Sequence, residues 1–290
     1  MSPVVDANAR PAATVVVLRD GPGGPEVFMV RRHEGTAFMG GAHVFPGGRV
    51  DAADGDADES WCDGIAHAAR QLDGLPPSEA IAYHVAAARE LFEEAGVLLA
   101  RHPQGDFVSL AAPADHDRLK QDRARVHEGD TTLRQVIERE GLRLALDALV
   151  LFAHWVTPPI DSRQFDTRFF MTRVPPDQTP AHDDTETTHS LWARPADAIA
   201  QSINQEIVLP PPTWSTLREI EPFESVKDAL GWARARTVIR RMPKAIEQDG
   251  HRVLLLPGDP LHPDSGGDDP PLETRFVLID RRWRAERPPA

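Results

Sequence analysis

The sequence predicts an α+β fold, in which a sheet packs against helices, on three observations. Residues 13–19 are rich in valine and lead through a Gly- and Pro-rich turn to a returning strand at 27–32, which predicts a hairpin. Residues 149–157 are almost entirely apolar and residues 165–174 alternate, so both are expected to be strands. The alanine-rich stretch at 78–95 predicts a helix between them, because alanine has the highest helix propensity.

The last turns of that helix carry an acidic cluster. Glu90, Glu93 and Glu94 are three and four residues apart, so a helix places them on one face. Arg89 neutralises part of their charge, and Gly96 is expected at the left-handed position just past the helix end. Two interpretations are open: an acidic surface that is salt-bridged to Arg89, or a site for a hard divalent cation such as Mg²⁺.

The start and the apolar side of the helix are also predicted. Ser78, which follows two prolines, is the expected N-cap. The apolar stripe is expected to consist of Ile81, Val85, Ala88 and Phe92. The glutamates then lie on another side of the helix.

Residues 45–48 (FPGG) favour the cation site. Glycines in such a turn let the backbone approach another group closely and expose its amides or carbonyls. Followed by residues 89–97 (RELFEEAGV), this turn resembles the Nudix box, the signature of hydrolases that cleave diphosphates linked to another moiety. Residues 41–48, with Phe92 and the two leucines after the box, are similar to one branch of that family, the acyl-coenzyme A diphosphatases of peroxisomes and their bacterial relatives.

The resemblance covers about residues 12–205 and implies an α/β/α Nudix sandwich with a mixed sheet. Two helical insertions are expected within it, at about residues 49–78 and 100–148. The second is expected to hold helices at 115–126 and 131–140, with Thr131 as an N-cap. It is either simple packing or a cap that shapes the substrate site, and we favour the cap.

The box departs from the family pattern. A standard box has a glutamate eight positions before the arginine, where this chain has Ile81. Residues 49–88 separate Gly48 from the arginine, so an insertion splits the box. Asp54 stands where the glutamate falls when it is counted from the glycine side.

By resemblance, Glu90 and Glu94 are direct ligands of Mg²⁺ or Mn²⁺. Glu93 shares in metal binding and pairs with Arg89, and a carbonyl of the glycine turn, that of Gly47 or Gly48, completes the shell. Metal ions neutralise the charge of a diphosphate and lower the pKa of a bound water. We therefore assign Glu93 and Arg89, with Glu186, to the catalytic apparatus.

Glu186 comes from an acidic loop at 182–186. In Nudix folds a carboxylate in the loop before such a strand often reaches the metal site, and Asp184 is the second choice. The alternative is a solvated acidic loop. A closing strand at 190–192 and a helix at 195–203 are expected to follow.

Four arginines are candidates for substrate binding. Arg31 and Arg32 end the second strand, and Arg49 follows residues 45–48, the glycine loop. Arg32 matches one arginine of a motif found in coenzyme A-directed relatives, whereas Ala37 occupies the position of the other. Exposure at the strand end is the alternative for the first two.

The fourth candidate is Arg168, with Arg163 beside it in sequence. Both are possible phosphate contacts. Salt bridges to Asp161 or Asp166 are the equally weighted alternative.

Composition limits the partners. The formal charge of −13 argues against a general nucleic-acid binder. The single cysteine, Cys62, excludes an intramolecular disulfide framework and suits a reducing, cytoplasmic location. No apolar run is long enough to cross a membrane, and no signal peptide is expected.

Residues 206–290 are expected to form a helical extension and tail, packed on the Nudix core or against a second copy in a homodimer. Helices are predicted at 213–220 and 225–241. Residues 253–256 and 276–279 are expected to pair as strands.

The function that follows is metal-dependent hydrolysis of coenzyme A or acyl-coenzyme A, giving adenosine 3′,5′-bisphosphate and (acyl-)4′-phosphopantetheine. One alternative is hydrolysis of another nucleoside diphosphate derivative, such as NADH or ADP-ribose. The other is a nucleotide-binding sensor without turnover, which the survival of all three box glutamates disfavours.

Overall fold

The computed structural model describes residues 9–35, 39–159, 163–183, 185–264, 266–267 and 271–288. Its main sheet has eight strands in the order β10-β2-β1-β9-β8-β11, with β3 paired to β2 and β4 paired to β1. These strands are β1 (Arg10–Gly21), β2 (Gly24–Arg32), β3 (His43–Val44), β4 (Gly47–Arg49), β8 (Val150–Val156), β9 (Phe165–Arg173), β10 (Thr187–Ala193) and β11 (Arg240–Arg241). The sheet is mixed, because β1 runs antiparallel to β2 and parallel to β9. The predicted hairpin and both predicted later strands are confirmed.

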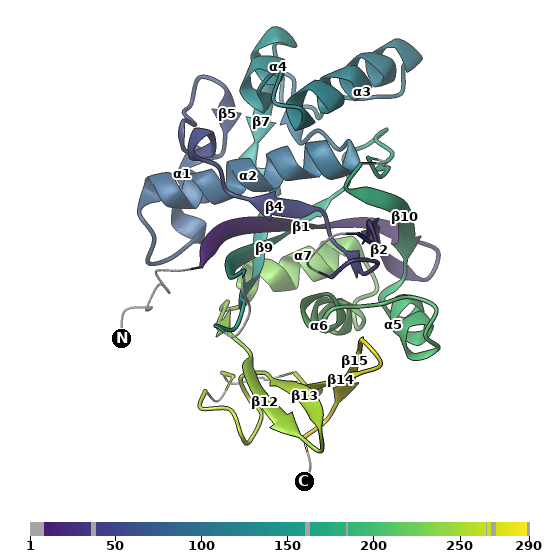
Figure 1. The fold of residues 1–290 in the computed structure, drawn as a ribbon. Coiled ribbons are helices and arrows are strands. Elements are labelled where there is room, and N and C mark those ends of the chain that lie inside the picture. The colour runs from purple at the N-terminus through teal and green to yellow at the C-terminus, as the bar shows by residue number, and fades with distance from the viewer. Residues whose placement is uncertain are drawn as a thin grey trace.

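Helices cover both faces of the sheet (Figure 1). One face packs against α2 (Pro77–Ala95), and the other packs against α5 (Pro195–Ile203), α6 (Pro211–Ile220) and α7 (Val226–Ala235). Each face has its own apolar core, because successive side chains of a strand point to opposite faces. The predicted α/β/α sandwich is confirmed.

The glycine loop enters the sheet where β1 and β2 separate. The two strands pair only from Leu18 to Gly21, against 24–27. Nearer its N-terminus, β1 pairs instead with β4, where Thr14 lies opposite Gly47. This places the glycine loop at the open end of the hairpin, against the last turns of α2.

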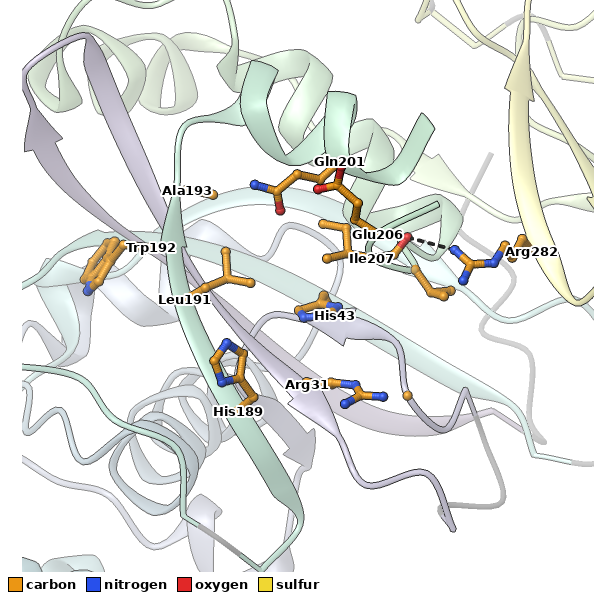
Figure 2. Close-up of a pocket in the computed structure, with 12 residues that line it drawn as sticks. Arg31, His43, His189, Leu191, Trp192, Ala193, Gln201, Glu206, Ile207 and Arg282 are labelled. Atoms are coloured by element: carbon orange, nitrogen blue, oxygen red, sulfur yellow. Dashed lines mark hydrogen bonds between the residues drawn. The ribbon is translucent and has the colours of Figure 1, made fainter. Parts of the chain in front are cut away.

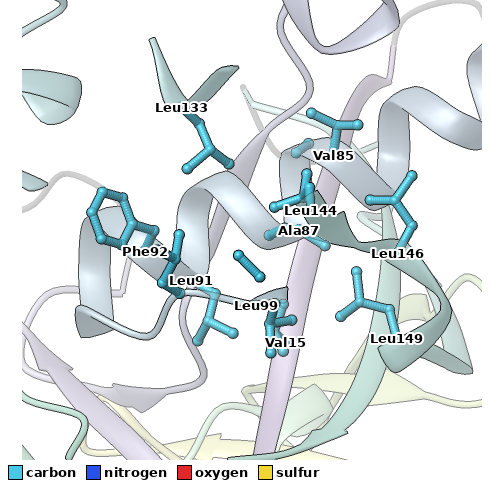
Figure 3. Close-up of a cluster of buried hydrophobic side chains, with 14 of the residues drawn as sticks. Val15, Val85, Ala87, Leu91, Phe92, Leu99, Leu133, Leu144, Leu146 and Leu149 are labelled. Carbon is cyan, nitrogen blue, oxygen red and sulfur yellow. The ribbon is translucent and has the colours of Figure 1, made fainter. Parts of the chain in front are cut away.

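The box helix α2 is buried on most of its surface. The predicted stripe is buried, and so are many residues beyond it, because the insertions pack on the side that faces away from the sheet (Figure 3). Gly96 ends the helix with φ 67°, as predicted. The predicted cap is wrong: the N-cap is Pro76, and Ser78 lies inside the first turn, since Pro77 takes the first helical position, where its missing N–H costs nothing.

The two insertions join in a small sheet of order β5-β7-β6. The first contains the 3₁₀ turn η1 (Ala52–Gly55), β5 (Cys62–Asp63) and α1 (Ile65–Gln71). The second contains β6 (Ala100–Arg101), α3 (Pro113–His127), α4 (Leu133–Arg139), β7 (Arg143–Ala145) and η2 (Leu146–Ala148). Both predicted helices of the second insertion are present, but the N-cap of α4 is Thr132 rather than Thr131. Thr132 makes a capping box with Gln135.

The C-terminal region is not mainly helical. Helix α7 ends at Ala235, short of the predicted end, and β11 then joins the main sheet beside β8. A separate antiparallel sheet follows, the C-terminal sheet, made of β12 (Lys244–Gln248), β13 (His251–Leu255), β14 (Arg275–Ile279) and β15 (Arg282–Glu286). The predicted strand pair is confirmed by Val253 lying opposite Val277. Among the helices of the described residues, none has the length and apolarity needed to cross a bilayer.

Candidate active site

Three of the predicted carboxylates line one cavity of about 1000 Å³, the main cavity, and Asp51 lines it as well. Glu90 and Glu94 reach it from α2, and Glu186 reaches it from the loop before β10. The backbone of that loop is tied to the end of β2, because the N–H of His33 donates to the Glu186 carbonyl at 3.0 Å. The structure therefore brings together three of the predicted acidic residues from two distant segments.

The electrostatics of this cluster are unfavourable without a cation. Burial raises the pKa of Glu90 to about 7, although the adjacent Arg89 opposes that rise. Burial also raises the pKa of Glu94 well above its ordinary value, and the charges of Glu90 and Glu186 add to the effect. Buried carboxylates that repel one another are the arrangement that a bound cation stabilises.

The glycine loop closes against the same carboxylates. The N–H of Gly47 donates to Glu94 Oε2 at 2.9 Å. A side chain at Gly48 would collide with the Glu90 carboxylate, and one at Gly47 would collide with the backbone of β1. The predicted close approach of the backbone is confirmed: Gly47 has no room for a side chain against the backbone of β1, and a side chain at Gly48 would force the Glu90 carboxylate to move.

Arg89 organises the cluster from behind. Its guanidinium donates to both oxygens of Asp54 at 3.0 Å, to Glu90 Oε1 at 2.9 Å and to Glu93 Oε1 at 3.1 Å. It also donates to the carbonyl of Arg49 at 2.8 Å, which fixes the glycine loop to α2. Arg89 is thus a positioning residue, which holds the carboxylate and the loop that line the cavity.

Asp54, from the first insertion, pairs with Arg89 of the box. Its side chain is only 3% exposed and also accepts the N–H of Asp51 at 2.8 Å. Ile81, at the position of the standard glutamate, is instead buried in the core on α2. Asp54, the position counted from the glycine side, contacts Arg89 because η1 folds it back toward α2.

Glu93 lies on the side of the cluster that faces the second insertion. Its carboxylate pairs with Arg89 and lies 3.9 Å from His127 of α3, and its carbonyl accepts from Arg123. Insertion and box helix are therefore joined by packing and by the hydrogen bond from Arg123. Among residues 100–148, all of which the structure describes, none lines the main cavity, so the favoured role as a cap over the substrate is wrong and simple packing explains the insertion.

The candidate arginines separate into two groups. Arg32 and Arg49 line the main cavity, as does Arg163. Arg32 lies close enough to Glu94 to favour its ionised form. These three arginines place positive charge where the oxygens of a diphosphate would need it.

Arg31 and Arg168 point elsewhere. Arg31, one residue from Arg32 on the strand, faces the other way, pairs with Glu34 at 2.6 Å and lines a separate cavity of about 550 Å³ with His43 (Figure 2). Arg168 lies on the α2 face, 3.6 Å from Asp166 and over the Tyr83 ring. Successive side chains of a strand point to opposite faces, so Arg168 points away from the main cavity. The structure therefore agrees with the alternative of a salt bridge to Asp166. Ala37, Asp161 and Asp184 lie outside the described residues.

Sequence reasoning missed Asp183, which shapes the loop of Glu186. Its carboxylate accepts the N–H groups of Thr185, Glu186 and Thr187, the last at 2.9 Å. Burial opposes ionisation of Asp183, but these hydrogen bonds outweigh it and hold its pKa below the ordinary value. The signal was present, because an aspartate followed by threonines is typical of a turn closed by its side chain.

Comparison with known proteins identifies the family. The family described as NUDT19 Nudix domain matches residues 65–220. Acyl-coenzyme A diphosphatase NUDT19 of Gallus gallus is 30% identical, over 88% of this chain and 80% of its own length. The Homo sapiens protein of the same name is 31% identical, over 88% of this chain and 77% of its own. This chain belongs to the Nudix hydrolase family.

A solved Nudix hydrolase from Alicyclobacillus acidocaldarius has a similar fold. It is 27% identical, with a TM-score of 0.63, and the match covers 77% of this chain and 96% of that one. The match includes nearly all of the Alicyclobacillus chain, whereas about a quarter of this chain lies outside it.

Nudix hydrolases use divalent metal ions, and the donors present here suit one. Glu90, Glu94 and Glu186 offer hard oxygen atoms, which Mg²⁺-type ions prefer. In the described part of the chain, no three acidic, histidine or cysteine side chains are placed together so that they could hold a metal ion.

Proposed function

We propose that this Nudix hydrolase cleaves the diphosphate of coenzyme A or acyl-coenzyme A. Water adds to one phosphorus, the bridging P–O bond breaks, and the products are adenosine 3′,5′-bisphosphate and (acyl-)4′-phosphopantetheine. The observation that carries the proposal is the juxtaposition of Glu90, Glu94 and Glu186 with Arg32 and Arg49 in one cavity. The names of the relatives at about 30% identity supply the substrate class.

We assign metal holding to Glu90 and Glu94, with the Gly48 carbonyl as a further donor and Glu93 as a supporting carboxylate. Mg²⁺ or Mn²⁺ bound there neutralises the diphosphate and lowers the pKa of a water. Arg32 and Arg49 bind diphosphate oxygens and orient the substrate.

Glu186 is the base in this proposal. It is exposed at the mouth of the main cavity, where its carboxylate accepts a proton from the attacking water. Its position is fixed by the backbone contacts to Asp183 and His33.

The test is product analysis by chromatography. The protein is incubated with Mg²⁺ or Mn²⁺ and, in separate reactions, with coenzyme A, an acyl-coenzyme A, NADH and ADP-ribose. Adenosine 3′,5′-bisphosphate from coenzyme A substrates, abolished by EDTA, is the expected result. Turnover of NADH or ADP-ribose alone would replace the substrate and keep the hydrolase. Nucleotide binding without any turnover would favour a sensor.

Two further expectations stay predictions. The single buried Cys62 supports a cytoplasmic location. The expected homodimer is tested by light scattering during size-exclusion chromatography, in which a mass near twice 32.0 kDa supports it.

A further inference from the structure

The C-terminal sheet turns one face toward the main cavity. Leu278 of β14 lies directly opposite Trp283 of β15, and directly opposite residues of an antiparallel pair project to the same side. Leu254 of β13 belongs to this side too, since it lies opposite Phe276, two residues from Leu278. Leu254, Leu278 and Trp283 all line the cavity that holds the carboxylates.

This face is held in place by the rest of the fold. Leu254 and Phe276 are buried in the core formed with α5, α6 and α7, and Trp283 packs against it. Arg282 donates to the carbonyl of Ile207 at 3.3 Å (Figure 2), and Arg218 of α6 pairs with Glu273 at 2.8 Å. The sheet is therefore a fixed wall of the cavity.

The cavity has two chemically different ends. The end at α2 holds the three carboxylates and, beside them, Arg32 and Arg49. The wall contributed by the C-terminal sheet consists of the apolar Leu254, Leu278 and Trp283 together with Arg252 of β13. It is continued by residues 210–212, which are three prolines. A charged diphosphate is stabilised at the first end, whereas a hydrocarbon chain loses its contact with water at the second.

We propose that the C-terminal sheet receives the acyl end of the substrate's acyl-pantetheine arm, and that Leu278 and Trp283 determine which acyl chains are accepted. This proposal rests on the proposed function, because it assumes that the diphosphate of an acyl-coenzyme A lies at the carboxylates. The C-terminal sheet lies outside residues 65–220, the part of the chain that matches the Nudix domain, whereas Glu90, Glu94 and Glu186 lie inside it. Hydrolysis and acyl selection are thus assigned to different parts of the chain.

The test compares kcat/KM for coenzyme A with kcat/KM for its acetyl, octanoyl and palmitoyl esters. In Leu278→Ala and Trp283→Ala, the value for the long-chain esters is expected to fall about tenfold, as for lost apolar contacts in a pocket. The value for coenzyme A is expected to change less than about twofold, because the diphosphate contacts are intact.

Ile279→Ala is the matched control. Ile279 follows Leu278 on the same strand and lies on the opposite face. Its replacement by alanine removes a side chain of the same size as that of Leu278. It is expected to leave the ratio between long-chain ester and coenzyme A unchanged. Leu278→Trp adds bulk to the wall, so it is expected to shift the preference toward short esters, and it keeps the test decisive if an alanine variant folds poorly.

The outcomes separate the two proposals. Equal losses for coenzyme A and all esters would overturn the acyl assignment, since the wall would then contact a part that all substrates share, such as the adenine. An unchanged ratio in every variant would also overturn it. If the wild-type protein hydrolyses none of the coenzyme A substrates, the proposed function itself fails, and this assignment fails with it.

Discussion

Replacing Asp54 by alanine tests whether an aspartate from the insertion takes the place of the missing box glutamate. The substitution removes both acceptors at 3.0 Å from the Arg89 guanidinium. Removing one partner of a buried ion pair costs about 3–5 kcal/mol. Arg89 keeps Glu90 and Glu93 as partners, so the lower end applies, about 3 kcal/mol. For a chain of this size that corresponds to a fall in Tm of about 6–12 °C.

The same change is expected to lower kcat by about 10–100-fold, because Arg89 then no longer fixes the Glu90 carboxylate and the glycine loop. Stability is measured by thermal and urea unfolding, and activity by release of adenosine 3′,5′-bisphosphate.

Asp51→Ala is the matched control for stability. Asp51 lies on the same loop and faces the same guanidinium, but at 3.7 Å and with 59% of its side chain exposed. An exposed pair of this kind contributes less than about 1 kcal/mol. The assignment of Asp54 to the role of the box glutamate is refuted if both variants lose the same free energy of unfolding. It is also refuted if Asp54→Ala has the same melting temperature as the wild type.

Three further predictions concern the site. Glu94→Gln is expected to keep the melting temperature, because the amide oxygen still accepts the N–H from the glycine loop. It is expected to lower kcat by more than about 100-fold, because the amide cannot supply the negative charge that holds a metal ion. Turnover within about tenfold of wild type would contradict the assignment of Glu94 to the metal site. Gly48→Ala is expected to lose activity at least about tenfold, since the new methyl group meets the Glu90 carboxylate, and full activity with normal KM would contradict that. Asp183→Asn is expected to cost about 1–2 kcal/mol. Because the pKa of Asp183 is lowered in the folded protein, this difference is present in full above about pH 4 and disappears as the pH falls below that value. A stability difference between Asp183→Asn and wild type that persists unchanged at acidic pH would contradict the assignment of an ionised Asp183 carboxylate to this turn.

Much of the fold was predictable because its signals are local. The helix at 77–95 and its glycine stop follow from propensity, spacing and the conformational freedom of glycine, and each acts within a few residues. The strands at 150–156 and 165–173 follow from apolar runs and alternation. The box glutamates and the glycine loop were found in the same way, since their chemistry depends on residue type and spacing.

Other features depended on contacts between distant segments. Whether Arg32 or Arg31 faces the cavity is decided by the side of β2 that meets the split in the sheet, which local sequence does not record. Asp54 had a sequence signal, but only the fold of η1 shows that it reaches Arg89 across 35 residues.

The C-terminal sheet shows the same limit most clearly. Two of its strands were predicted, yet their alternation alone does not say what their apolar face covers. That depends on how the sheet docks against α6 and the loop at 207, through contacts between residues far apart in sequence. The sequence by itself therefore determined the chemistry at the end of the box helix, and only the tertiary structure decided which walls enclose it. The reason is that the burial of a side chain and the direction in which it points are set by packing between segments rather than within them.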